Sequence, residues 1–198
     1  MKKSLIIATF NAHKAGEIRA ILPSLPLRLR TLAEFPEAAP AAEDGVTLEE
    51  NAVKKASAAA RFTGSWALAD DTGLEVDALG GAPGVRSARY AGENASGADN
   101  NARLLGELAG VPDARRSARF ATVMALVSPS GEIALSRGVL EGRITLAPRG
   151  VNGFGYDPLF EPEGSALTLA ELPDAKKNVL SHRARALAGL LPLLQKLR

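Results

Sequence analysis

Two adjacent carboxylates, Asp70 and Asp71, follow a short apolar run at residues 66–69 and precede a glycine-rich stretch at residues 78–84. If the apolar run is a strand, the carboxylates lie at its carboxyl end, where α/β folds place their ligands. Oxygen donors of this kind suit Mg²⁺, which usually binds together with a substrate phosphate. An acidic surface turn is the better interpretation of an isolated Asp-Asp-x-Gly, so the other motifs of the chain decide between the two.

A polar segment between the first predicted strand and the first predicted helix contains Thr9, Asn11 and Lys14. Backbone N–H groups at a helix N-terminus, together with these side chains, can bind a phosphate. The segment lacks the glycines of a Walker A loop. Thr9 as the last residue of the strand and Asn11 as a helix N-cap would explain the same pattern.

A loop carboxylate, Glu43, precedes a predicted helix that carries Lys55. Glu43 could join Asp71 as a metal ligand, while Lys55 could contact a phosphate or orient the attacking water molecule. Ordinary charge pairs on a solvated helix are the alternative, and the spacing alone favours them.

Aromatic residues lie among glycines at residues 150–160. Phe154 and Tyr156 could hold a flat ring by stacking, a contact worth about 1–3 kcal/mol per base in proteins that bind single strands. Asp157 could then bind the edge of that ring. A glycine-rich hairpin with packed aromatic side chains is the alternative.

A second polar cluster, Lys177, His182 and Arg183, lies at the entry to the last predicted helix. His182 and Arg183 offer donors suited to purine carbonyl oxygens, and Lys177 can contact a phosphate. A single histidine is more often structural, and Ser181 serves equally well as a helix N-cap.

Hydrophobic periodicity and capping residues predict the elements that position these side chains. Thr47 and Glu50 resemble a capping box at the start of a helix. A turn at 128–131 predicts a hairpin. Strands are expected at residues 5–9, 66–69, 119–127 and 132–140, and helices at 13–22, 48–62, 96–108 and 181–197. The intermixed order predicts an α/β protein with a partly antiparallel sheet.

Composition excludes several classes of function. The 198 residues carry a net charge of +2 with scattered cations, which does not indicate a nucleic-acid surface. No apolar run is long enough for a transmembrane helix, and the N-terminal run is too short for a signal peptide. The chain has no cysteine, which removes thiolate chemistry and fits a cytoplasmic protein.

Taken in order, these motifs resemble those of the inosine/xanthosine triphosphate pyrophosphatase family, the Ham1-like enzymes. The resemblance covers nearly the whole chain and depends on the ordered set, because each motif alone is weak. The matching positions are Thr9, Asn11 and Lys14, the Glu-x-Asn-Ala motif at 49–52 with Lys55, and the segments 69–74, 79–84, 87–92, 154–158 and 181–183.

The resemblance implies an elongated, two-lobed α/β fold around a twisted mixed sheet with flanking helices and an active cleft between the lobes. It implies one domain over residues 1–198, usually assembled as a homodimer. It also implies Mg²⁺-dependent hydrolysis of ITP, dITP and XTP to the monophosphate and pyrophosphate, which keeps these nucleotides out of nucleic acid.

The resemblance further implies a role for each matching residue. Asp71 is expected to be the catalytic carboxylate, assisted by Lys55, and the expected metal ligands are Glu43, Asp70 and Asp71. Residues expected to contact the triphosphate are Thr9, Asn11, Lys14, Lys55, Thr72 and Lys177. Residues expected to flank the base are Phe154, Gly155 and Tyr156, and those expected to bind its edge are Asp157, His182 and Arg183.

Two other functions remain possible at this point. A Maf-like pyrophosphatase has a related fold and acts on other modified or pyrimidine nucleotides, but is not expected to contain Phe-Gly-Tyr-Asp-Pro together with Ser-His-Arg. A nucleotide sensor without catalysis would not need a carboxylate that activates water. A panel of nucleotide substrates separates all three.

Overall fold

A mixed β-sheet forms the frame of the fold in the computed structural model, which describes residues 3–22 and 25–197. The hydrogen-bonded strand order is β2-β1-β3-β5-β6-β7, and β4 pairs with β3. The strands are β1 (Ser4–Ile7), β2 (Arg28–Thr31), β3 (Trp66–Val76), β4 (Pro83–Gly84), β5 (Ser117–Val127), β6 (Ile133–Ile144) and β7 (Phe160–Pro162). The helices are α1 (Ala12–Ile21), α2 (Leu48–Thr63), α3 (Gly97–Glu107), α4 (Asp174–Leu180) and α5 (His182–Leu194). The predicted α/β class is confirmed.

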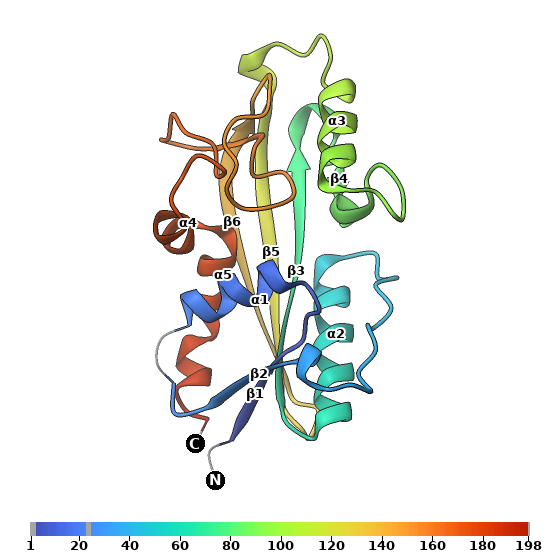
Figure 1. Ribbon diagram of the computed structural model, residues 1–198, viewed down its shortest axis with the longest axis vertical. Coiled ribbons are helices and arrows are strands. Elements are labelled where there is room, and N and C mark those ends of the chain that lie inside the picture. The colour runs from blue at the N-terminus through green and yellow to red at the C-terminus, as the bar shows by residue number, and fades with distance from the viewer. Residues whose placement is uncertain (1–2, 23–24, 198) are drawn as a thin grey trace. The chain divides into compact units, whose positions relative to one another are not determined.

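The sheet is mixed because β1 runs parallel to β2 and β3, whereas β4 and β7 are antiparallel to their partners. Parallel neighbours need a crossover connection, which α1 provides between β1 and β2 and α2 provides before β3 (Figure 1). Within the described residues, no helix is long and apolar enough to cross a membrane.

Two compact units divide the chain, and each has its own hydrophobic core. The first unit comprises Met1–Asp71, Thr122–Gly138 and Arg183–Arg198, and the second comprises Thr72–Ala121 and Val139–His182. Strands β3, β5 and β6 therefore contribute residues to both units. The first core includes Leu5, Ile18, Leu68, Met124 and Leu187. The second core includes Leu74, Leu104, Phe120, Ile144 and Phe160.

Both faces of the sheet are covered in the first unit. Leu5 of β1 packs in one cluster with Ile18 of α1 and Leu187 of α5, so these two helices lie on the same face. Successive strand residues point to opposite faces, so the fully buried Ile6 points to the other face, where α2 contacts β1.

Helix α2 begins and ends where its local sequence predicts. The Thr47 side chain accepts a hydrogen bond from the Glu50 backbone N–H at 3.1 Å, and Gly64 ends the helix in the left-handed conformation at φ 61°. Its buried face consists largely of alanines at positions 52, 56, 59 and 60, which permit close packing on the sheet. The helix predicted over 48–62 is confirmed, as are those over 13–22 and 96–108 within a residue or so at each end.

Strand β3 is longer than predicted, and this corrects the expected position of the two carboxylates. The strand continues through Asp70 and Asp71 to Val76, so these residues lie inside a strand and not at its carboxyl end. Aspartate is disfavoured in strands, which is why sequence pattern alone ends the strand at residue 69. The strand persists because β4 pairs with its second half at Leu74 and Glu75, and because partners from other elements neutralise both aspartates.

The hairpin between β5 and β6 is confirmed. The Ser128 backbone N–H donates to the Glu132 carbonyl at 2.9 Å across the turn, and the two strands are neighbours in the sheet. Strands β2 and β7 and helix α4 lack a clear sequence signal, since β2 and β7 are short strands at the two ends of the strand order and α4 has seven residues. Pro192 lies inside α5, which ends shortly after it.

Candidate active site

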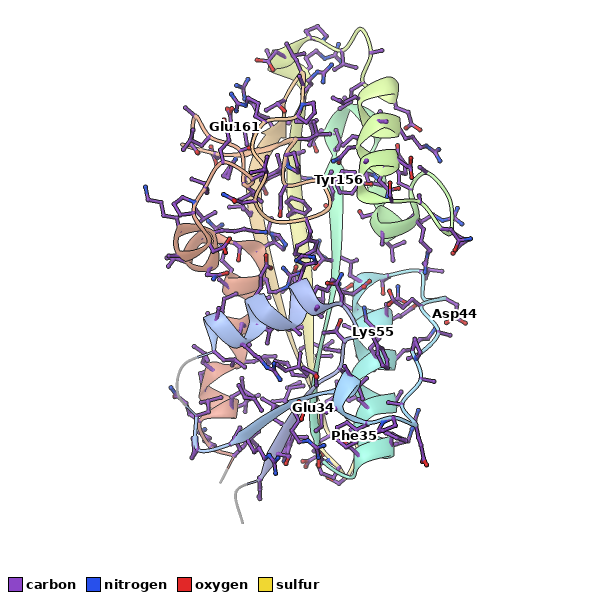
Figure 2. The ribbon with its side chains drawn as sticks, in the orientation of Figure 1. Glu34, Phe35, Asp44, Lys55, Tyr156 and Glu161 are labelled. Carbon is purple, nitrogen blue, oxygen red and sulfur yellow. The ribbon has the colours of Figure 1, made fainter. Side chains whose placement is uncertain are left out.

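Asp71 and Lys55 form the centre of a buried charged cluster in the first unit. Lys55 lies on α2 (Figure 2), and its Nζ lies 2.7 Å from Oδ1 of Asp71 on β3. The same Nζ lies 3.5 Å from Glu43 Oε2, so one ammonium group faces two carboxylates. The local sequence places Lys55 there because α2 starts at the Thr47 cap and turns this side chain toward the strand.

Asp70 points to a different set of cations. Its Oδ2 accepts hydrogen bonds from Arg183 Nη2 at 2.9 Å and Nε at 3.2 Å, and it lies 3.4 Å from Lys14 Nζ. Arg183 also donates to Glu17 of α1 through Nη1. Asp70 and Arg183 are buried, with relative exposures of 2% and 1%. Each member of this pair also faces a further opposite charge, Lys14 for Asp70 and Glu17 for Arg183, so the network holds Asp70 in a fixed position next to Asp71.

The environments of these neighbouring aspartates shift their pKa values in opposite directions. Burial raises the pKa of Asp71, because desolvation disfavours the charged form more than Lys55 favours it. Burial also opposes ionisation of Asp70, but the positive charges of Lys14, Arg183 and Lys55 outweigh it and hold the pKa of Asp70 well below its usual range. A carboxylate with a raised pKa beside one that stays ionised is the arrangement expected of a proton acceptor and a permanent anion.

Lys55 remains protonated in this cluster. Burial alone would lower the pKa of its ammonium group, but the negative charges of Asp71, Asp70 and Glu43 outweigh burial and raise it. A fixed positive charge next to a carboxylate can stabilise negative charge on a phosphate group.

The segment between β1 and α1 has the predicted capping arrangement. Asn11 is the N-cap of α1, and its Oδ1 accepts hydrogen bonds from the backbone N–H groups of His13 and Lys14 at 2.9 and 3.1 Å. Thr9 Oγ1 accepts from the Asn11 N–H at 3.1 Å. The same polar side chains therefore shape a helix N-terminus whose dipole favours an anion.

Among residues 3–22 and 25–197, no group of three or more His, Cys, Asp or Glu side chains is arranged to hold a metal ion by itself. Glu43 and Asp71 do face one point, which the Lys55 ammonium occupies. Two carboxylates directed at one cation are a donor set that Mg²⁺ accepts when phosphate and water oxygens complete its coordination. The residues present therefore fit a metal bound jointly with a substrate, and the metal remains a prediction.

The second unit contains the aromatic loop, residues 150–157, and a buried ion pair. Asp157 Oδ2 accepts from Lys177 Nζ at 2.5 Å and from the Phe154 backbone N–H at 2.8 Å. Lys177 Nζ also lies 5.0 Å from the centre of the Phe154 ring. Gly153 has φ 73°, and a Cβ there would lie 2.1 Å from Asp157 Oδ2, so only glycine permits this pairing.

Tyr156 has a packing role in this unit. It is 5% exposed, belongs to the hydrophobic core, and its hydroxyl donates to the Ser87 carbonyl at 2.8 Å. Asn101 Nδ2 donates to the Gly155 carbonyl at 3.0 Å and fixes the same loop from α3. Phe154 is only partly buried, so of the two aromatic rings it is the more accessible one for a planar ligand.

His182 is held by an aromatic stack. Its ring lies 4.6 Å from that of Phe120 with an interplanar angle of 21°, and Phe120 also contacts Phe160 at 4.7 Å. The imidazole is therefore held by Phe120 of β5, which packs in turn on Phe160 of β7, and its 3% exposure leaves it little freedom.

The structure distributes the predicted site residues between the two units. Members of the first unit are Thr9, Asn11, Lys14, Glu43, Lys55, Asp70, Asp71 and Arg183, and members of the second are Thr72, Phe154, Gly155, Tyr156, Asp157, Lys177 and His182. Two of these residues have contacts that differ from those their expected roles suggest. Arg183, expected at the base, contacts Asp70, and Lys177, expected at the triphosphate, contacts Asp157. The roles themselves remain predictions.

Sequence reasoning assigned no role to three residues that support the site: Glu17, Asn51 and Phe120. Glu17 binds Arg183, Asn51 donates to Asp71 Oδ2 at 3.3 Å, and Phe120 stacks on His182. Asn51 had a detectable signal, because it is an amide on the buried, alanine-rich face of a predicted helix. Glu17 and Phe120 had none, since their partners are distant in sequence.

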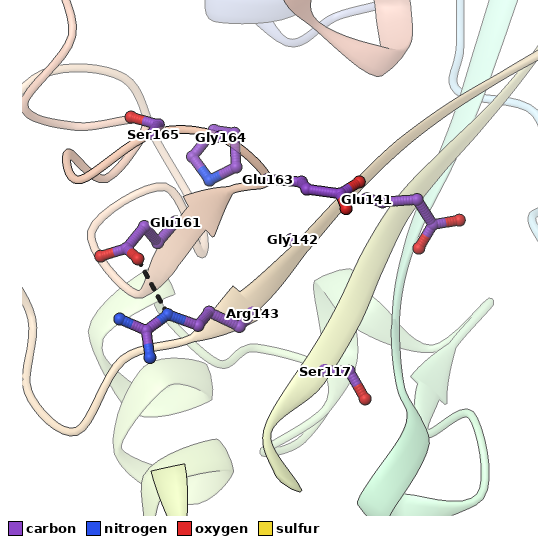
Figure 3. A pocket seen from close by; sticks show the side chains of 9 residues that line it. Ser117, Glu141, Gly142, Arg143, Glu161, Glu163, Gly164 and Ser165 are labelled. Carbon is purple, nitrogen blue, oxygen red and sulfur yellow. Dashed lines mark hydrogen bonds and ion pairs between the residues drawn. The ribbon is translucent and has the colours of Figure 1, made fainter. Parts of the chain in front are cut away.

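A polar pocket of about 450 Å³ in the second unit is distinct from these residues (Figure 3). Its lining includes Glu141, Arg143, Glu161 and Glu163. Arg143 Nε donates to Glu161 Oε1 at 2.8 Å, and Arg149 donates to Glu161 Oε2 at 2.6 Å. Two arginines thus neutralise Glu161, and the lining residues given for this pocket include none of the predicted site residues.

The fold and the site residues together define a mixed α/β protein with a buried carboxylate–lysine cluster. Comparison with protein families identifies the family of this α/β protein. The chain belongs to the Ham1 family, whose model matches residues 5–193. The family resemblance predicted from the ordered motifs is confirmed.

Curated relatives are similar over nearly their whole length. A protein of Geobacter sulfurreducens named dITP/XTP pyrophosphatase is 55% identical over 186 residues, which cover 94% of each chain. A protein of Lactiplantibacillus plantarum with the same name is 52% identical over 189 residues, covering 96% of this chain and 93% of the relative.

Solved structures show the same fold. A HAM1 protein from Coxiella burnetii has a TM-score of 0.88 with 41% identity and covers 98% of this chain and 99% of its own. The Ham1 protein of Staphylococcus aureus has a TM-score of 0.86 with 37% identity and covers 98% of both chains.

Proposed function

We propose that this protein is a nucleoside triphosphate pyrophosphatase that hydrolyses ITP, dITP and XTP to the monophosphate and pyrophosphate. The names of relatives more than 50% identical to it support this activity. The observation that carries the proposal for this chain is the pairing of buried Asp71, with its raised pKa, and the Lys55 ammonium at 2.7 Å. A binding protein would not need such a pair.

In the proposed reaction Asp71 acts as general base. It accepts a proton from a water molecule whose oxygen attacks the α-phosphorus, and the bond from that phosphorus to the α–β bridging oxygen breaks. The electron pair of the broken bond leaves with pyrophosphate. Lys55 stabilises the negative charge that develops on the phosphate oxygens. Asp70 stays ionised and holds the positive charges of Lys14 and Arg183 in place beside the catalytic pair of Asp71 and Lys55.

The phosphate chain is proposed to bind at the first-unit residues. The N-terminus of α1 offers its dipole, and Thr9, Asn11 and Lys14 offer polar groups next to it. The Lys14 side chain is partly exposed, so its ammonium group can contact a phosphate oxygen of the substrate.

Mg²⁺ is proposed as the cofactor, with Glu43, Asp70 and Asp71 as its protein ligands, of which Glu43 and Asp71 face Lys55. When bound, it would supply Lewis-acid stabilisation of the phosphate oxygens. Because Lys55 contacts both carboxylates, it would also hold them at a common point before any cation binds.

The second-unit residues are proposed to bind the base. Phe154 can stack on a purine, and Asp157 and His182 can bind its edge. A pocket with donors for a 6-oxo group rejects ATP, because the 6-amino group leaves those donors without acceptors. Exclusion of GTP requires a contact at the 2-amino group. The proposal extends to a homodimer in the cytoplasm that removes these nucleotides from the precursor pool.

The experiment that tests this function is release of pyrophosphate, as against phosphate, from ITP, XTP, dITP, ATP, GTP, dTTP and UTP, each with Mg²⁺ and with EDTA. Pyrophosphate from ITP, dITP and XTP only, abolished by EDTA, is the expected result. Turnover chiefly of pyrimidine nucleotides would indicate the Maf-like activity, and tight binding without turnover would indicate a sensor.

A further inference from the structure

Asn51 is a buried amide that no assigned role explains. It lies in the first turns of α2 with 1% exposure, on a face where its neighbours Leu48, Ala52 and Ala56 are apolar. Buried amides require hydrogen-bond partners, and a small apolar residue would pack there without that requirement. The hydrogen bonds that this amide makes should therefore explain why it stands at this position.

The two ends of this amide bind two different parts of the candidate site. Asn51 Nδ2 donates to Asp71 Oδ2 at 3.3 Å, and Oδ1 accepts from the Gly45 backbone N–H at 2.8 Å. Asp71 belongs to β3, whereas Gly45 belongs to the loop that contains Glu43. One side chain on α2 thus connects the strand carboxylate with the loop carboxylate.

The loop is built for this contact. A Cβ at Gly45 would lie 2.6 Å from Asn51 Oδ1 and 2.9 Å from Glu50 Cβ, so the glycine permits the close approach. The next residue, Val46, donates its backbone N–H to Glu50 Oε2 at 2.8 Å. Two adjacent backbone N–H groups of the loop are therefore bound by two adjacent side chains of α2.

Asp71 has different partners on its two oxygens. Oδ1 accepts from Lys55 Nζ at 2.7 Å and Oδ2 accepts from Asn51 Nδ2 at 3.3 Å. A carboxylate held at both oxygens by side chains from one helix cannot rotate about its Cβ–Cγ bond without losing a hydrogen bond. Lys55 also faces Glu43, so the same helix aligns both carboxylates.

We propose that Asn51 is a positioning residue, which orients the Asp71 carboxylate and, through Gly45, holds the Glu43 loop so that both carboxylates face Lys55. This inference rests on the proposed pyrophosphatase function. Asn51 does not contact the substrate in this proposal, so its loss should lower kcat much more than it changes KM.

The first test is Asn51→Asp, which keeps an acceptor for Gly45 but replaces the donor to Asp71 by a carboxylate oxygen. With ITP as substrate, kcat should fall roughly 10- to 100-fold, the effect expected of a misplaced reacting group, with little change in KM. The matched control is Asn100→Asp in the second unit. Asn100 is 5% exposed, accepts from the Ala91 N–H at 2.8 Å and donates to the Ala88 carbonyl at 3.1 Å. This control should lower the melting temperature comparably and keep kcat close to that of the wild type.

A second test approaches the same contact from the loop. Gly45→Ala introduces a methyl group against Asn51 Oδ1, and its effect on kcat should be smaller in an Asn51→Ala background than in the wild type. Asn51→Ala also keeps the inference testable if Asn51→Asp does not fold.

The outcomes separate the inference from the function on which it rests. A wild type that releases pyrophosphate from ITP, together with folded Asn51 variants of normal kcat, overturns the inference and leaves the function standing. Equal losses of kcat in Asn51→Asp and Asn100→Asp, or additive effects of the Gly45 and Asn51 changes, also overturn it. A wild type without pyrophosphate release overturns both. A kcat loss confined to Asn51, with non-additivity at Gly45, supports the inference.

Discussion

The two units hold their candidate site residues in contrasting ways. In the first unit, Asp70 and Asp71 lie side by side on one strand and are neutralised by the long cationic side chains Lys14, Lys55 and Arg183. In the second unit, hydrogen bonds from side chains to backbone carbonyls and the buried Lys177–Asp157 ion pair fix the aromatic loop, and stacking on Phe120 fixes His182.

This contrast matches two different physical tasks. Stabilising charge on a phosphate requires groups that are already charged and oriented, and ion pairs between carboxylates and lysines provide both. Recognising a flat ring requires a surface of fixed shape, which packing and backbone hydrogen bonds provide. We therefore expect changes in the first unit to alter turnover and changes in the second to alter stability and substrate affinity.

The largest effect is expected from Asp71→Asn. Loss of the general base should lower kcat for pyrophosphate release from ITP about 10²- to 10⁴-fold. The melting temperature should change little, because a neutral amide replaces a carboxylate whose burial already disfavours its charge. Asp44→Asn is the control: this exposed carboxylate pairs with Lys54 at 2.7 Å and should leave activity unchanged. Near-normal turnover by Asp71→Asn would remove Asp71 from its proposed role as general base.

A large loss of stability is expected from Lys177→Met in the second unit. The Lys177–Asp157 pair has side-chain exposures of 3% and 4%, and removing one partner leaves a buried carboxylate without its counter-ion. The free energy of unfolding in urea should fall by about 3–5 kcal/mol. Lys54→Met removes one partner of the exposed Lys54–Asp44 pair and should have no measurable effect on the free energy of unfolding. Equal results for both variants would contradict the importance of the buried pair.

A smaller effect is expected from Phe120→Leu, which removes the ring stacked on His182. If His182 binds the base, KM for ITP should rise roughly two- to twelvefold, the equivalent of ~0.5–1.5 kcal/mol, with little change in kcat. Phe160→Leu changes the same core without removing the ring beside His182 and should affect KM less. If both variants raise KM equally, core packing and not the stack is responsible.

The smallest effect concerns acid stability. The pKa of Asp70 is lowered in the folded state, so the folded state binds fewer protons than the unfolded state as pH falls below about 4, where a free aspartate titrates. The stability that Asp70 contributes is complete above that pH and is lost on acidification. The difference in melting temperature between the wild type and Asp70→Asn should thus be greatest near neutral pH and shrink toward pH 3. A constant difference would show that the ionised form is not what stabilises the fold.

Local features of this chain were predictable from the sequence because their causes lie within a few residues. The Thr47 cap, the alanine face of α2 and the turn at 128–131 depend on neighbours along the chain, and these elements were predicted correctly. The extent of β3 was not predictable, because its second half depends on pairing with β4 and its two aspartates depend on cations from other elements.

The sequence by itself determined the α/β class, the main helices and strands and the family, because these follow from periodicity, capping and an ordered set of motifs. The tertiary structure alone decided which aspartate has a lowered pKa and which a raised one, since Arg183 lies 113 residues from Asp70 and Lys55 lies 16 residues from Asp71. It also decided that Arg183 binds Asp70 and that Asn51 connects Asp71 with Gly45. Burial and charge act through space, so such pairings cannot be deduced from spacing along the chain.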